Sequence, residues 1–249
     1  MDELANPKEV NAKNPGHSKP GFWSSVWAIV WKDLAIERHT WQIISVMLVF
    51  SLTVVIVFSF ALGAGTLSPG SNLAREASLG FYWATILLAG TLGLNRSFSS
   101  EQENRSLDAI LVAPVDRAAI FIGKVISITL FMVLVELLLI PIFVAFFDRP
   151  FYRPHVIGVL FLGTVGYAAA GVLISSMSSQ TRLRGVLLPV LLLPLALPSV
   201  LAAATATSAL IRTDLPAWSE VQFPIALVLA YDILMLVTGY FTFHFVVEE

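Results

Sequence analysis

The sequence contains no cysteine and only four histidines. The lack of cysteine excludes disulfides, thiolate catalysis, Cys-ligated zinc, iron–sulfur clusters and the C-x-x-C-H haem attachment motif. The histidines are scattered along the chain and do not have the spacing of metal ligands: His17, His39, His155 and His244. No bound metal is therefore expected.

Motifs for catalysis are also missing. The chain has no G-x-x-x-x-G-K-[ST] loop, and the nearest string, Gly123-Lys124-Val125, lacks the upstream glycine and the hydroxyl residue. It has neither an H-E-x-x-H helix nor a G-x-S-x-G elbow. We expect no catalytic residue and no directly bound cofactor.

Charged residues are scarce, at 13%, whereas hydrophobic residues make up 57% and the mean hydropathy is +0.80. Soluble domains have about 25% charged and about 45–50% apolar residues. This composition predicts an integral membrane protein and excludes a secreted enzyme, a nucleic-acid binder and a disordered scaffold. The net charge of −2 is too balanced for a polybasic surface, so no nucleic-acid partner is expected.

Six stretches are apolar enough to form membrane-spanning helices, which need about 20 mostly apolar residues. They predict an all-α, six-span domain over residues 22–249, preceded by a flexible cytoplasmic tail at 1–21 without the features of a signal peptide. The predicted spans are 43–62, 79–95, 118–147, 156–175, 185–209 and 223–247.

The distribution of lysine and arginine predicts the orientation. With both termini inside, ten of these residues lie in the predicted cytoplasmic segments and four in the outer loops. We therefore expect a multi-pass protein of the bacterial cytoplasmic (inner) membrane with both termini cytoplasmic.

Residues 22–40 have an amphipathic pattern. Five apolar residues recur at helical spacing: Trp23, Val26, Trp27, Val30 and Leu34. Lys32 and Asp33 lie off this apolar stripe, whereas Glu37 lies on it. Tryptophans favour the membrane–water boundary. The pattern predicts an interfacial helix, and the alternative is a simple soluble approach to the first span.

The polar segment between spans two and three predicts a cytoplasmic helix at about 100–113. Ser100 and Glu103 have the spacing of a capping box, and Pro114 ends the helix. We expect this helix to present a short apolar ridge of Leu107, Ile110 and Leu111, and to expose Glu101, Glu103 and Asp108 to water. Such a ridge could dock into a groove of another protein.

Three ionisable residues fall within predicted spans, where charges are costly and functional by default. Glu136 lies nearest a span centre and suits either substrate or proton handling or a hydrogen-bonded packing role. Lys124 is close enough to the cytoplasmic end to extend its ammonium to the surface. Asp232 could pair with an arginine or face water.

The fifth span contains three prolines, Pro189, Pro194 and Pro198. Each removes a backbone donor, which predicts either a kinked wall of a translocation path, a re-entrant element or a static kink. The fourth span is rich in glycine and alanine between Gly158 and Gly171, which predicts a close helix-packing face.

The segment from Glu101 to Pro114 resembles the membrane subunits of ABC-2-type transporters. Their pattern has an acidic pair, then Gly-Thr/Ser-Leu-Glu, a few apolar residues and proline. Ser106, Leu107, Asp108 and Pro114 match it, and Arg105 replaces the usual glycine. The resemblance implies that this stretch is the coupling helix that contacts an ATPase subunit.

A narrower resemblance begins at Leu162-Gly163-Thr164 and includes the three-proline span that follows Arg182 and Arg184. These blocks are similar to the haem exporter protein B (CcmB) family, the permease subunit of the cytochrome c maturation ABC transporter. Together the matching blocks cover roughly residues 22–200.

This resemblance implies a non-catalytic permease that couples ATP hydrolysis by a partner to haem export or to release of a haem-loaded chaperone. The implied partners are an ABC ATPase that holds ATP and Mg²⁺, a second permease copy, and haem-handling and small accessory subunits. Haem itself is the implied cargo rather than a cofactor.

Other functions also fit parts of the pattern. One is an ABC-2 permease for a lipid, glycan or drug, and another is a structural subunit that scaffolds a haem-handling partner. A third is an ion-coupled carrier that uses Glu136 and Asp232. Such carriers have inverted repeats, and no internal repeat is evident in the sequence.

Overall fold

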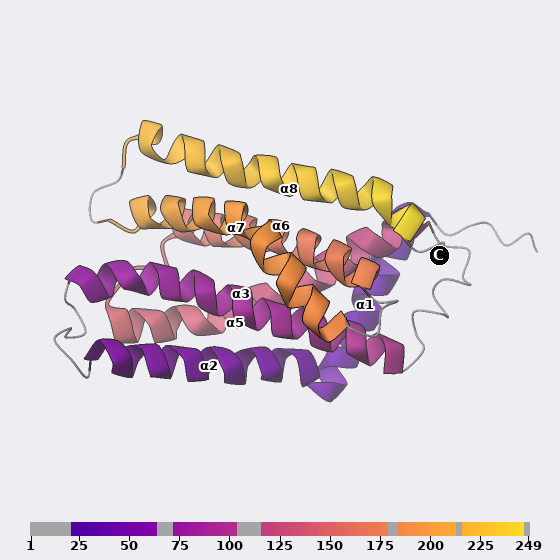
Figure 1. The fold of residues 1–249 in the computed structure, drawn as a ribbon, viewed down its shortest axis with the longest axis horizontal. Helices are drawn as coiled ribbons and strands as arrows, with labels where there is room; N and C mark the ends of the chain where they lie inside the picture. The colour runs from indigo at the N-terminus through magenta and orange to yellow at the C-terminus, as the bar shows by residue number, and fades with distance from the viewer. Residues whose placement is uncertain (1–20, 64–71, 104–115, 179–183, 213–215, 247–249) are drawn as a thin grey trace, which may run out of the picture.

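The structure is a computed structural model that describes residues 21–63, 72–103, 116–178, 184–212 and 216–246. In these ranges the chain is helical and has no strand (Figure 1). The helices are α1 (Phe22–Thr40), α2 (Gln42–Gly63), α3 (Asn72–Glu103), α5 (Arg117–Phe147), α6 (Pro154–Ser178), α7 (Arg184–Leu210) and α8 (Trp218–Val246).

Six of these helices are long and apolar enough to cross a membrane, which confirms the all-α, six-span prediction. Five of the predicted spans agree with the structure to within a few residues, and the second is longer than predicted. The spans are Gln42–Ala61, Ala77–Glu101, Arg117–Phe147, Pro154–Met177, Val186–Leu210 and Trp218–Phe243.

The most buried span is α6, which packs chiefly against α7 and α8 and also contacts α3 and α5. Little hydrophobic force holds helices together in lipid, so small residues that permit close approach dominate such contacts. The buried run Ala168, Ala169 and Ala170 lies in this helix. The packing face predicted from its glycines and alanines is therefore confirmed from Gly163 to Gly171, whereas Gly158 is exposed and packs against nothing in the described chain.

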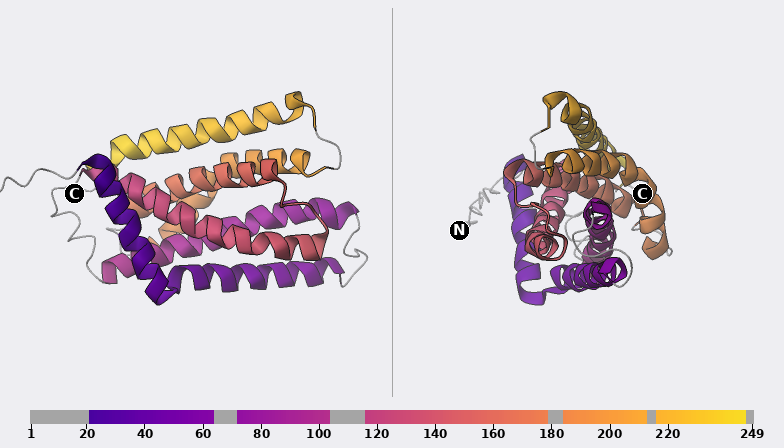
Figure 2. Two further views of the ribbon diagram at one scale, coloured as in Figure 1. Left: turned by 180° about the vertical axis from the view of Figure 1, so that it is seen from behind. Right: turned by 90° about the vertical axis from the view of Figure 1, so that its left-hand side faces the viewer.

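The helix α1 crosses one end of the bundle at a steep angle to the spans, at the end where α8 finishes (Figure 2). Its main partner is α5. The two backbones come close at Gly123, where an added Cβ would lie 3.0 Å from Ile29 and 3.2 Å from the carbonyl oxygen of Val26. A larger residue at position 123 would push α1 away.

The predicted apolar stripe of α1 is partly wrong. Val26 and Val30 are buried, but Trp23 and Trp27 point outward and are 66% and 62% exposed. The buried face instead continues through Ile29, Asp33 and Glu37. The reason is that small and β-branched residues fit against α5, whereas the amphipathic indoles are suited to the membrane–water boundary.

A single residue joins α1 to α2. Trp41 adopts a left-handed conformation (φ 50°), and its N–H donates to the carbonyl of Glu37. The Glu37 carboxylate is itself buried, and its Oε1 accepts hydrogen bonds from the N–H groups of Ile43 (2.9 Å) and Ile44 (2.8 Å). Glu37 therefore caps the first turn of α2, where a negative charge is also favoured by the helix dipole.

Replacing this cap should destabilise the corner. Glu37→Leu leaves two backbone donors without an acceptor, which should lower the free energy of unfolding by roughly 1–3 kcal/mol. Glu37→Gln keeps an oxygen acceptor and should lose less. Thermal unfolding of the two purified variants in detergent compares them directly, and equal midpoints would show that the cap contributes nothing.

Candidate functional site

Four charged side chains meet at the α1 end of the bundle. Lys124 Nζ of α5 lies 2.9 Å from Asp33 Oδ2 of α1 and also contacts Glu101 Oε1 of α3. Lys32 Nζ lies 3.0 Å from Glu101 Oε1 and 3.1 Å from Asp33 Oδ1. We call these four residues the ion cluster, and it joins three helices.

The ion cluster is balanced in charge and largely shielded from solvent. Lys124, Asp33 and Glu101 are buried, and only Lys32 is partly exposed. Burial works against the charged form of Lys32, but the carboxylates of Glu101 and Asp33 outweigh it and raise the pKa of Lys32 above its usual 10.5. Two ammonium groups and two carboxylates therefore compensate one another in a site with little water.

Lys124 does not extend to the surface as predicted. Its side chain is only 3% exposed, because Asp33 and Glu101 lie within reach and neutralise it inside the protein. These two carboxylates stabilise the ammonium in place of the water that it would otherwise contact at the membrane surface.

The prediction that Glu101 faces water is also wrong. Its side chain is buried in the ion cluster, and it belongs to α3, the helix that forms the second span. No new helix begins at Ser100, because α3 continues through Glu103. No proline or glycine interrupts the sequence from Leu94 to Glu103, so the helix already supplies the hydrogen bonds that a capping box would provide.

Most of the predicted coupling helix falls outside the described residues. Glu103 is the last residue of α3. The other predicted contacts belong to 104–115, which the structure does not describe: Leu107, Asp108, Ile110, Leu111 and Pro114. This segment joins α3 to α5 in the chain, and the contact between Glu101 and Lys124 links the same two helices.

Glu136 lies buried between α5 and α6. It accepts a hydrogen bond from the hydroxyl of Thr164. This is the contact that the packing interpretation of Glu136 requires. Glu136 also lines a groove of about 330 Å³ between α5 and α6, among Leu137, Ile157 and Phe161.

Asp232 of α8 has a different environment. It is buried against α6, and within the described residues neither carboxylate oxygen has a hydrogen-bond partner. The structure thus places it neither beside an arginine nor in water, the two possibilities that the sequence left open. An unpaired buried carboxylate is costly, which makes Asp232 a candidate functional residue of the membrane interior.

The prolines of α7 lie within one continuous helix that bends visibly along its length (Figure 1). Pro194 and Pro198 are four residues apart and are exposed on the outside of the chain, and Pro189 is partly buried. The bend thus shapes the outer surface of the chain.

Sequence reasoning missed Asp33 as a buried group, because it placed this residue off the apolar stripe. The spacing of Asp33 from Val26 and Val30 follows the buried stripe, so the periodicity itself could have identified it. Glu37, which the pattern placed on the apolar face, is buried there. No sequence pattern pointed to Thr164 as the partner of Glu136.

The contact between Asp232 and α6 predicts a position-specific effect of glycine substitution. A Cβ at Gly166 would overlap Asp232 Oδ1 and crowd the Tyr231 ring, whereas a Cβ at Gly158 would meet nothing within 4 Å. Gly166→Ala should therefore lower stability by about 1–3 kcal/mol through overpacking. Gly158→Ala should leave stability unchanged or raise it by up to about 1 kcal/mol. Unfolding midpoints measured in the same detergent test the pair, and equal midpoints would contradict the close packing.

Comparison with known proteins agrees with the resemblance seen in the motifs. The model of the family described as CcmB protein matches residues 24–248. Heme exporter protein B of Pseudomonas aeruginosa is 31% identical over 152 residues, which are 61% of this chain and 66% of that protein. The proteins of the same name from Rhodobacter capsulatus and Paracoccus denitrificans are 30% and 29% identical, over 70% and 72% of this chain and 78% and 80% of their own lengths. With nearly the whole six-span region matched, the chain belongs to the CcmB family.

Proposed function

We propose that this chain is the membrane subunit of an ABC transporter for cytochrome c maturation. It would couple ATP hydrolysis by a separate subunit to haem export or to release of a haem-loaded chaperone. Membership of the CcmB family and the printed name of the relatives, Heme exporter protein B, support the haem part of this proposal. In this proposal, the chain itself catalyses no reaction.

The observation that carries the coupling proposal is the position of the ion cluster. Glu101 lies near the last residue of α3, and Lys124 lies in the second turn of α5. A force applied to 104–115 by an ATPase would reach both helices at these residues. Because Asp33 also pairs with Lys124, the same force would reach α1.

The lengths of the two helices support transmission across the bundle. The helices α3 and α5 have 32 and 31 residues, which at 1.5 Å per residue extend through the membrane. A tilt at the ion-cluster end would therefore move the opposite ends as well. This is a rigid-helix change of the kind found in other switching proteins.

The proposed assembly has two permease copies, two ATPase copies, and haem-handling and accessory subunits. The proposed location is the bacterial cytoplasmic membrane, with both termini and the α1 end facing the cytoplasm. The basic residues near α1 support this orientation, among them Lys32, Arg38 and Arg117. ATP and Mg²⁺ would bind to the partner subunit.

Neutralising the ion cluster tests stability and coupling separately. Glu101→Gln or Lys124→Gln alone leaves an uncompensated buried charge and should cost about 3–5 kcal/mol. The double variant restores the charge balance and should recover most of that stability. Neutralising the exposed Arg212–Glu220 pair, whose atoms are 3.9 Å apart, is the matched control and should cost less than about 1 kcal/mol.

The coupling readout uses the stable double variant in the assembled complex. Stimulation of the partner ATPase and the yield of cytochrome c should both fall, by at least about fivefold if the coupling free energy is 1 kcal/mol or more. Normal stimulation and yield from a folded double variant would overturn the role of the ion cluster. Charge reversal at Glu103 and Asp108 then tests contact with the ATPase directly.

The partners themselves are tested by mild-detergent purification of the tagged chain from its own membranes, followed by mass spectrometry. We expect an ABC ATPase together with haem-handling maturation proteins. Recovery of an ATPase without haem-handling proteins would point to another cargo. Absence of an ATPase from intact complexes would favour an ion-coupled carrier, for which the unpaired Asp232 would be the first residue to test.

A further inference from the structure

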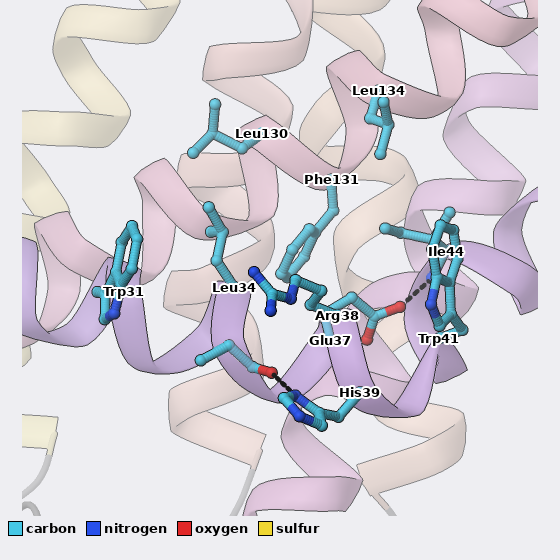
Figure 3. Close-up of a pocket in the computed structure, with 11 residues that line it drawn as sticks. Trp31, Leu34, Glu37, Arg38, His39, Trp41, Ile44, Leu130, Phe131 and Leu134 are labelled. Atoms are coloured by element: carbon cyan, nitrogen blue, oxygen red, sulfur yellow. Dashed lines mark hydrogen bonds between the residues drawn. The ribbon is translucent and has the colours of Figure 1, made fainter.

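A groove separate from the ion cluster lies where α1, the corner at Trp41 and α5 meet (Figure 3). Its volume is about 650 Å³. Its lining includes Trp31, Arg38 and His39 from α1, Trp41 from the corner, and Phe131 and Leu134 from α5. The proposed coupling mechanism does not use this groove.

The groove has an apolar wall and a basic edge. Leu130 and Leu134 lie one turn apart on α5 and are 43% and 41% exposed, so this wall faces outward from the bundle. Phe131 closes it from behind. Such a surface, on a helix that spans the membrane, suits a hydrocarbon chain lying along it.

Arg38 supplies the basic edge. In Figure 3 its guanidinium extends into the groove toward Leu34 and Phe131. No ion-pair partner of Arg38 is found in the part of the chain that the structure describes. Glu37 also lines the groove, but within the described residues its carboxylate forms no ion pair with Arg38, and its buried Oε1 accepts the N–H groups of Ile43 and Ile44.

His39 also lines the groove. Its Nδ1–H donates to the carbonyl of Ala35 at 3.0 Å, and the ring is exposed. The indoles of Trp31 and Trp41 stand at the two sides of the groove and are 74% and 58% exposed. Indoles in such positions mark the boundary between lipid headgroups and acyl chains. A ligand here would have its polar part beside α1 and its apolar part beside α5.

We infer that this groove binds an anionic phospholipid from the leaflet on the α1 side. Its phosphate would lie at Arg38, on the α1 side of the groove, and one acyl chain would lie along Leu130 and Leu134. Charge complementarity favours this occupant: an anionic lipid brings a net negative charge to Arg38, whereas the choline cation of a zwitterionic lipid offsets its own phosphate, and a soluble anion would leave the apolar wall uncovered.

The first test compares lipid headgroups by native mass spectrometry of the full-length chain titrated with dioleoylphosphatidylglycerol or dioleoylphosphatidylcholine. We expect tighter binding of the phosphatidylglycerol, and Arg38→Gln should weaken it about fivefold, the effect of one arginine near an anionic lipid. Arg212→Gln removes an exposed arginine at the other end of the bundle and should leave binding unchanged.

The second test fills the apolar wall. Leu134→Trp should weaken binding of both lipids, because bulk there occupies the space of the acyl chain. Leu138→Trp is the matched control, since Leu138 is a similarly exposed residue one turn further along α5 that does not line the groove. It should bind both lipids as the unchanged protein does.

Several results would overturn the inference. Equal phosphatidylglycerol binding by Arg38→Gln and Arg212→Gln would remove the role of the basic edge, and equal binding by the two tryptophan variants would remove that of the apolar wall. Displacement of the lipid by excess inorganic phosphate would make the groove a soluble-anion site. Displacement by equimolar hemin would assign it to the cargo.

Discussion

The pairing of Lys124 with Asp33 determines where α1 lies, and several other features follow from that position. A buried ammonium on a spanning helix needs a carboxylate nearby, and α1 brings one across the end of the bundle. With α1 held there, Glu37 reaches the start of α2 and the chain turns at the single residue Trp41. The groove between α1 and α5 is bounded by the same arrangement.

The spans could be predicted from the sequence because hydrocarbon imposes a simple requirement on length and polarity. The existence of α1 was predicted for a similar reason. Its buried face was not, because hydropathy ranks tryptophan as apolar and aspartate as exposed, whereas here Trp23 faces outward and Asp33 faces inward. The deciding contacts, with Gly123 and Lys124, come from residues about 90 positions away in the sequence.

For the two carboxylates inside the spans, the sequence likewise identifies the residues but not the contacts that surround them. Their cost in a membrane is evident from the sequence, so Glu136 and Asp232 could be chosen as candidates. Their surroundings depend on how α6 lies between α5 and α8. Thr164 gives Glu136 a hydrogen-bond donor, whereas Gly166 gives Asp232 only a close, non-bonding surface. Two residues that look alike in the sequence therefore have different environments.

The outward tryptophans of α1 have a consequence for how the protein moves. Trp23, Trp27 and Trp31 follow one another at intervals of four, so their indoles lie along one side of the helix. Indoles at the membrane–water boundary resist displacement toward either water or hydrocarbon, so in the interfacial position predicted for α1 they would hold this helix at a constant depth in the leaflet. The spans α3 and α5 are joined to α1 by the ion cluster. In any rearrangement, they would therefore pivot against a helix whose height in the membrane does not change.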